Sequence, residues 1–357
     1  MRALVLSLAA VAALAVTAGS ANAGRPVLAR PSLAAISTGP QFIPDSTLTA
    51  PKARRVLAAA SYWGGQYTTA TGELVTVYVS DSYPQDPAIA QRWADFLDSL
   101  VHGSELSKVT AYLAPLAEVQ SYCGAEALAC YSPRDSLLVA PGDAPTSDVS
   151  AEAVVTHEYG HHVASHRSNA PWAAVDYGTK RWASYVQVCR RAHSGELHPG
   201  AETLPNYVLN PGEAFAESYR VLNQRKAGLV ETPWDVVDRS LYPTATSLSL
   251  LEQDVTSPWT TTTTTAYRGA LPAGARSRNY TVATALDGTL KLDLRASTGV
   301  RLSLHVARAS GTTVADRAIA AGHDSAVGTT ICGQRSYRVR VTRVRGAGAF
   351  ALTVTRP

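Results

Sequence analysis

The segment His157-Glu158-Tyr159-Gly160-His161 has the residue types and the spacing of a metal-dependent hydrolytic site. His157 and His161 lie four positions apart, so on an α-helix they project from one face, about 40° apart around the axis. Two imidazoles presented in this way can occupy two corners of a tetrahedral Zn²⁺ site. Glu158 is placed to accept a proton from a metal-bound water. The segment therefore predicts one catalytic zinc ion, with Glu158 as the general base.

A catalytic zinc site needs a third protein ligand and an open fourth position. The metzincin pattern would place a glycine and a histidine after His161, but Ala164 and Arg167 stand at those positions, which excludes that pattern. The remaining candidate for the third ligand is Glu213. The preceding Asn210 and Pro211 favour the start of a helix at this point. Glu213 is then either the third ligand or only the acidic member of a capping box.

Two further histidines, His162 and His166, also lie four positions apart. On the same helix they would face a direction rotated from the metal pair. We interpret them as residues behind the ligands or at the surface, and not as ligands.

The two segments together resemble the gluzincin clan of zinc metallopeptidases, with its thermolysin-like pair of helices. The resemblance is carried by His157–His161 and by Asn210–Glu217, which has the pattern Asn-Pro-x-Glu-x-Phe-Ala-Glu. It implies that His157, His161 and Glu213 bind Zn²⁺ and that Glu158 is the base. It also implies that Glu217, where the family often has Asp, hydrogen-bonds a ligand histidine.

The elements that must position these residues predict an α+β, zincin-like catalytic domain over residues 61–257. Alternating or apolar runs predict strands at 73–80, 109–120 and 136–140, and helical spacing predicts an amphipathic helix over 86–106. Helices over 148–166 and 211–227 would carry the two motif segments. One of the strands 109–120 and 136–140 would be the edge strand along which an extended peptide substrate pairs.

Residues 258–357 have a different sequence pattern from the residues before them, and this pattern predicts an all-β sandwich. Short alternating segments separated by Gly or Asn recur at 289–294, 301–306, 336–341 and 350–355, without helical periodicity. The six-threonine run 260–265 is either the first strand or a linker. Segments such as Gly269-Ala270-Leu271 and Asp287-Gly288-Thr289-Leu290, with the closing Phe350–Val354, resemble a bacterial pre-peptidase C-terminal domain. That resemblance implies a β-sandwich appended to a secreted peptidase.

The first 23 residues predict a signal peptide that is cleaved after Ala23. Arg2 is followed by an Ala/Leu/Val core and then by Ala21-Asn22-Ala23, a small-x-small cleavage pattern. Residues 24–60 predict a flexible leader or a propeptide, with Arg54-Arg55 as a candidate processing site. No later run is apolar enough for a transmembrane segment, so we expect a secreted protein.

Four cysteines in an exported chain favour disulfide bonds. We expect the local pair Cys123–Cys130, which leaves Cys189 to pair with Cys332. The alternative is that the last two are free buried thiols.

The formal net charge of +4 hides an asymmetry between the two parts of the chain. From Pro258 onward, 13 arginines and one lysine face four aspartates, which gives +10. The part before it, without the signal peptide and its Arg2, must then carry −7. The basic part is a candidate for holding the protein on an anionic cell-envelope polymer. Nucleic acid is not expected as a partner, because the chain is exported and its basic part has few aromatic residues for base stacking.

These observations predict a secreted zinc metalloendopeptidase that hydrolyses peptide bonds through a zinc-activated water, acting on a protein or peptide substrate. Two alternatives stay open. The protein could be a zinc amide hydrolase that acts on cell-wall material. It could also be a non-catalytic secreted binding protein with a vestigial zinc site, although a structural site has no use for a base beside the metal.

Overall fold

The computed structural model describes residues 56, 58, 60–318, 325–333 and 335–357, all within the unit Phe42–Pro357. The signal peptide, most of the leader and the Arg54-Arg55 pair lie outside the described residues. Among the described residues, no helix is long and apolar enough to cross a membrane.

The first part of the fold is built on a mixed five-stranded sheet with the order β1-β2-β3-β5-β4. Its strands are β1 (Tyr62–Thr68), β2 (Leu74–Ser80), β3 (Thr110–Ala114), β4 (Cys130–Ser132) and β5 (Leu137–Pro141). β2, β3 and β5 run parallel, while β1 and β4 run antiparallel to their neighbours. The predicted strands over 73–80 and 136–140 agree with β2 and β5. The two antiparallel strands at the edges were not predicted.

Because β3 and β5 both lie inside the sheet, neither can be the edge strand that we expected to pair with a peptide. β4 comes from the loop before β5 and adds outside it, so the edges are β1 and β4.

The predicted helix over 86–106 is shorter in the structure, where α2 spans Pro87–Ser99. Asp86 caps its start, since its carboxylate accepts a hydrogen bond from Ala88 N at 3.0 Å. The chain leaves the helix because Val101 bonds to a distant helix: its N–H donates to Asn223 Oδ1 at 2.7 Å, and its carbonyl accepts from Tyr219 Oη at 2.6 Å. A 3₁₀ turn, η2 (Leu106–Lys108), follows.

The predicted strand over 109–120 is wrong in its second half. β3 ends at Ala114, and residues Leu116–Cys123 form helix α3. Pro115 separates the two elements with φ −58°; it lacks the N–H that a central strand needs and its φ suits the start of a helix.

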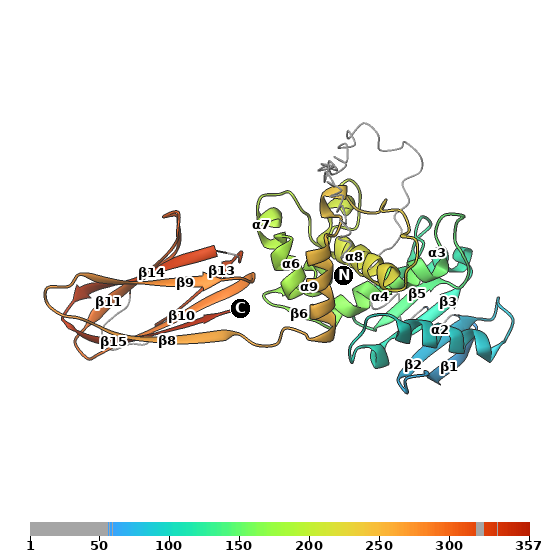
Figure 1. Ribbon diagram of the computed structural model, residues 1–357, viewed down its shortest axis with the longest axis horizontal. Coiled ribbons are helices and arrows are strands. Elements are labelled where there is room, and N and C mark those ends of the chain that lie inside the picture. Colours follow the sequence, from blue (N-terminus) through green and yellow to red (C-terminus); the bar gives the residue numbers. More distant parts are fainter. Residues whose placement is uncertain (1–55, 57, 59, 319–324, 334) are drawn as a thin grey trace, which may run out of the picture. The chain divides into compact units, whose positions relative to one another are not determined.

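Two buried helices, α4 (Ala151–Ser165) and α8 (Pro211–Lys226), agree with the helices predicted for the motif segments. Ser150 caps α4 by accepting a hydrogen bond from Ala153 N at 3.1 Å, and Asn210 caps α8 by accepting one from Gly212 N at 2.9 Å. α4 packs against α8 and against β5 (Figure 1). Both helices are therefore held by the interior of this part of the fold.

Short elements fill the segment between α4 and α8. They are β6 (Ser168–Asn169), β7 (Trp172–Ala173), α5 (Ala174–Tyr177), α6 (Lys180–Tyr185), α7 (Val188–His193) and the 3₁₀ turn η3 (Tyr207–Leu209). After α8 come the 3₁₀ turn η4 (Arg239–Leu241) and α9 (Ala245–Thr256), a helix that was not predicted. The buried Asp254 of α9 accepts hydrogen bonds from the backbone N–H groups of Arg181 and Trp182. It thereby ties α9 to α6.

In the last part of the fold, the helices and strands that the structure describes are all strands, and they form two four-stranded antiparallel sheets (Figure 1). One sheet has the order β13-β10-β15-β8, and the other has the order β12-β11-β14-β9. The first contains β8 (Thr263–Leu271), β10 (Gly288–Ala296), β13 (Ser325–Ile331) and β15 (Gly348–Arg356); the second contains β9 (Ser277–Thr284), β11 (Arg301–Arg308), β12 (Thr313–Ala318) and β14 (Arg335–Arg345). The inner faces share one apolar core. The predicted β-sandwich-like arrangement is confirmed, and the threonine run enters β8 at Thr263.

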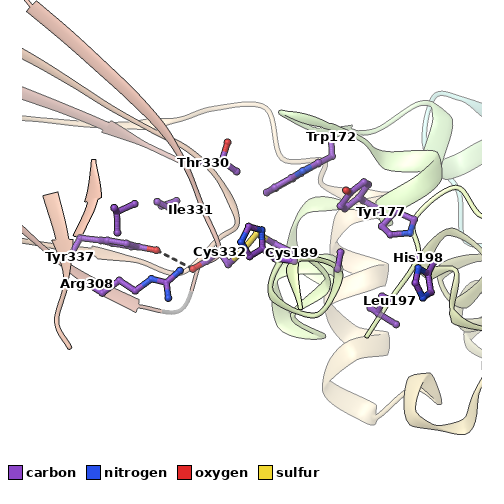
Figure 2. Close-up of a pocket in the computed structure, with 14 residues that line it drawn as sticks. Trp172, Tyr177, Cys189, Leu197, His198, Arg308, Thr330, Ile331, Cys332 and Tyr337 are labelled. Atoms are coloured by element: carbon purple, nitrogen blue, oxygen red, sulfur yellow. Dashed lines mark hydrogen bonds between the residues drawn. A yellow bond between two sulfur atoms is a disulfide. The ribbon is translucent and has the colours of Figure 1, made fainter. Parts of the chain in front are cut away.

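Both expected disulfide bonds are present, Cys123–Cys130 and Cys189–Cys332. The second joins α7 to the residue that follows β13 (Figure 2). Two buried polar contacts lie near it: Lys180 Nζ donates to Asp287 O at 2.9 Å, and Asp287 N donates to Ser184 Oγ at 2.8 Å. Disulfide bonds are consistent with an extracellular protein.

Candidate metal centre

Helix α4 presents His157 and His161 on one buried face, as the spacing predicts. Their side chains point the same way, with 3.3 Å between the two Nε2 atoms. Only 5% of His157 and 4% of His161 is exposed. Glu158 lies beside His157 in the same helix and is fully buried.

Glu213 of α8 completes a compact group of three donor atoms. Its Oε2 lies 3.4 Å from His157 Nε2 and 3.4 Å from His161 Nε2. The three atoms form a nearly equilateral triangle that belongs to two different helices. Among the described residues this is the group of histidine and acidic side chains arranged to hold a metal ion.

The size of this triangle fits a tetrahedral zinc ion. With metal–ligand bonds of about 2.0–2.1 Å, two donors at the tetrahedral angle lie about 3.3–3.4 Å apart. The three edges measure 3.3, 3.4 and 3.4 Å. Two imidazole nitrogens and one carboxylate oxygen also form a donor set that Zn²⁺ accepts, and three protein ligands leave the fourth position open.

The structure separates the two roles that the sequence left open for Glu213. In a capping box its carboxylate would accept from the N–H of Asn210, but that N–H donates to Tyr207 O at 2.9 Å. The carboxylate is instead held among the metal-site residues: Tyr207 Oη donates to Oε2 at 3.1 Å, and Asn210 Nδ2 lies 3.4 Å from Oε1. Glu213 therefore faces the two histidines and does not close a capping box.

Glu217 lies one turn further along α8, on the other side of the His157 ring. Its Oε1 is 3.8 Å from His157 Nδ1, while its Oε2 accepts a hydrogen bond from Arg220 Nε at 2.6 Å. Arg220 is buried and also donates to Gln224 Oε1 at 2.7 Å. The sequence analysis did not identify Arg220 as the partner of Glu217. The only pattern that could have indicated it is the spacing of three positions between the two residues on a helix.

Gly160 allows α4 and α8 to approach each other. A Cβ at this position would lie 2.8 Å from Ala216 Cα and 3.2 Å from Ala216 O. Such a distance is too short for a carbon–carbon contact, so a side chain here would push the helices apart. The glycine between the two histidines therefore helps to bring Glu213 within reach of them.

His162 belongs to the core, which corrects our placement of it behind the ligands or at the surface. It is fully buried; Nδ1 lies 3.0 Å from Tyr131 Oη, and Nε2 lies 2.9 Å from Glu105 O. Burial lowers its pKa from 6.5 to about 3, so the ring is neutral at physiological pH. His166 is half-buried, with Nδ1 2.9 Å from His162 O.

One acidic residue near the centre was missed by the sequence analysis. Asp176 of α5 is half-buried; burial raises its pKa, and the charge of His161 opposes that rise. It lies in the segment between the two motif helices, whose sequence has no regular period.

No family model matches this chain, and no curated protein matches it. Among solved structures, it is similar to the pre-peptidase C-terminal domain of a collagenase from Bacillus anthracis, with 20% identity, 25% of this chain and 87% of that chain covered, and a TM-score of 0.23. It is also similar to the Yersinia pseudotuberculosis-derived mitogen, with 12% identity, 27% and 86% covered, and a TM-score of 0.23. A carbohydrate-binding module in complex with calcium and xylotriose has 14% identity, 26% and 97% covered, and a TM-score of 0.19. We draw no functional conclusion from likenesses at this level.

Proposed function

We propose that this chain is a secreted, zinc-dependent metallopeptidase with a zincin-like catalytic domain of the gluzincin type. The observation that carries the proposal is the triangle of donor atoms from His157, His161 and Glu213. Its edges of 3.3–3.4 Å match the donor spacing of a tetrahedral zinc ion. Two buried helices beside a mixed sheet supply these residues, in the order that the gluzincin resemblance implies.

A zinc ion at this position would polarise the scissile carbonyl and lower the pKa of a bound water to about 7. Glu158 would accept the proton of the attacking water and pass it to the leaving amine. Tyr207 and Asn210 hold the carboxylate of Glu213 by hydrogen bonds, so its oxygen points at the histidines. Glu217, fixed by Arg220, faces the Nδ1 atom of His157 and favours the tautomer whose Nε2 can bind metal.

The open fourth position and the glutamate beside the ligands favour a catalytic site over a structural one. Structural zinc sites have four protein ligands, most often with cysteine among them, and the cysteines of this chain are all in disulfide bonds. Glu158 places its carboxyl group in a fully buried position next to a ligand histidine. A role as general base accounts for that position.

The experiment is metal analysis of the purified protein, together with casein and peptidoglycan hydrolysis assays with and without a chelator. We expect about one zinc ion per chain, casein cleavage that the chelator abolishes, and recovery on adding Zn²⁺. Hydrolysis of peptidoglycan amides without casein cleavage would assign the site to cell-wall material. Bound zinc with neither activity would make the protein a binding protein with a vestigial site.

A further inference from the structure

A cavity of about 530 Å³ lies beside the Cys189–Cys332 disulfide (Figure 2). One wall is formed by Trp172, Tyr177 and residues of α7 and the loop after it. The other is formed by residues of β11, β12, β13 and β14. The Cys189–Cys332 disulfide joins the two walls covalently, so it limits how far the walls can move apart.

The basic side chains of this cavity have no acidic counterpart in its lining. None of its lining residues is acidic, while His193, His198 and Arg308 all line it. Their side chains make no hydrogen bond or ion pair with any residue that the structure describes. A cavity with a permanent guanidinium, two imidazoles and no carboxylate favours an anionic ligand.

Apart from Thr330, the rest of the lining is apolar or aromatic. Trp172 and Tyr177 stack with 5.4 Å between ring centroids and 20° between planes, which makes a flat, rigid surface. Across the cavity, Tyr337 donates a hydrogen bond to Cys332 O at 3.2 Å and lies beside Ile331 (Figure 2). The ligand that fits such a lining carries an anionic group next to an apolar one.

Two segments that line this cavity continue to residues beside the candidate metal centre. Tyr177 belongs to α5, which packs against α4, the helix of the two histidines, and against α8, the helix of Glu213. His198 N donates to Leu209 O at 3.0 Å, directly before the cap residue Asn210, whose Nδ2 lies 3.4 Å from Glu213 Oε1. The cavity is therefore connected to the candidate metal centre through α5 and through the segment from His198 to Asn210.

We propose that this cavity binds an acidic segment of the peptide substrate, with one carboxylate on Arg308, another on His198 of the opposite wall, and an apolar neighbour on Trp172 (Figure 2). The inference rests on the proposed peptidase function and deepens it: the β-sandwich supplies part of the substrate site. Arg308 recognises the planar carboxylate through two parallel N–H groups, and the aromatic surface recognises the side chain beside it.

The test uses the zinc-loaded Glu158→Gln protein, which should bind peptides without cleaving them. Two peptides with blocked ends are titrated calorimetrically, one with alternating Glu and Phe and one with alternating Gln and Phe. We expect the Glu peptide to bind at least about tenfold more tightly, since a hydrogen bond to a charged group contributes more than one between neutral groups. Arg308→Glu should abolish the difference and His198→Gln should reduce it. Arg301→Glu, an exposed arginine at the opposite end of β11, is the matched control and should preserve it.

The outcomes separate the cavity from the catalytic function. Equal affinity for the two peptides, or a difference that both cavity variants preserve, would overturn the inference. So would tighter binding of a peptide-free glycan strand containing N-acetylmuramic acid, because the site would then recognise a sugar acid. If the wild type cleaves no peptide bond but the Glu peptide still binds through Arg308, the proposed function fails and the binding site stands.

Discussion

Gly160 of α4 lies against Ala216 of α8 so closely that a Cβ at Gly160 would be 2.8 Å from Ala216 Cα. The atom that it would meet is backbone, which cannot move aside by changing a rotamer. Gly160 and Ala216 belong to the two helices that carry the donor atoms. The separation of α4 and α8 therefore sets the distance between Glu213 and the two histidines.

Gly160→Ala should therefore weaken metal binding as well as stability. Overpacking costs about 1–3 kcal/mol, and the higher helix propensity of alanine returns only about 1 kcal/mol. We expect a lower free energy of unfolding in urea and reduced zinc affinity in a competition titration. Gly274→Ala is the control, because nothing lies within 4 Å of a Cβ at that position. A variant with unchanged zinc affinity would show that the helix separation does not govern the site.

Glu158→Gln tests the assignment of the base. The substitution keeps the size of the side chain and removes no ligand, so zinc content should stay the same. Hydrolysis of casein should fall by at least about 10²-fold, the usual contribution of general acid–base transfer. Activity near that of the wild type in the zinc-loaded variant would rule out Glu158 as the base.

Glu213→Ala and Glu217→Ala should differ in their effect on zinc. Glu213→Ala removes a donor of the triangle, so its loss of zinc affinity should exceed the loss in the other variant. Glu217→Ala removes a partner behind His157 and should cost about 10–100-fold in affinity or activity. Zinc affinity is measured by competition with a chromophoric chelator. The reverse order would mean that Glu217 binds the metal and Glu213 does not.

The sequence analysis was most successful where a local pattern determines a local arrangement. Residues four apart on a helix share a face, so His157 and His161 could be placed together from their spacing alone. The helix start at Asn210 was readable from cap chemistry, and the alternation of Val339 and Val341 with arginines agrees with their buried and exposed positions in β14.

Where the prediction failed, distant residues decide the structure. The end of α2 at Ser99 depends on Val101 bonding to Asn223 and Tyr219, which are more than a hundred positions away. The edge position of β4 depends on which strand it pairs with. None of these relations has a period in the sequence.

From the burial of Lys180 we predict a specific dependence of the free energy of unfolding on pH. Burial lowers its pKa from 10.5 to about 8, while Asp287 and Asp254 oppose the shift. Between about pH 8 and pH 10.5 the unfolded chain therefore holds this proton more often than the folded chain does, so through this group the free energy of unfolding rises with pH in that window. Below pH 8 the cost of burying the charge is constant.

The measurement for Lys180 compares urea unfolding of the wild type and Lys180→Met at pH 7, 8, 9 and 10. The wild-type free energy of unfolding minus that of the variant should change little from pH 7 to 8 and should increase steeply from pH 8 to 10. Tyrosine ionisation affects both proteins alike and cancels in the difference. A difference that does not change with pH would mean that the pKa of Lys180 is not lowered by its burial.

The last prediction concerns the arginines of β14 and their binding to an anionic cell-envelope polymer. Arg338 and Arg340 are exposed, and neither forms an ion pair with the described residues; Arg340 Nε donates to the neutral Asn279 Oδ1 at 3.1 Å. Arg343 is used differently, since it donates to the carbonyls of Pro272 and Ala273. The exposed pair therefore keeps its charge available for an external anion.

Retention of the full chain on anionic envelope material should depend on this pair and on salt. The Debye length falls from about 10 Å at 0.1 M to about 3 Å at 1 M, so binding at low salt should be released near 1 M. The double variant Arg338→Glu and Arg340→Glu should be retained less at low salt, whereas Arg343→Gln, which loses backbone contacts but leaves the exposed pair intact, should behave like the wild type. If wild type and double variant bind equally, the two arginines serve only to solvate an exposed sheet face. If the double variant binds less but salt has no effect on the wild type, the contact is not electrostatic and an anionic polymer is not its partner.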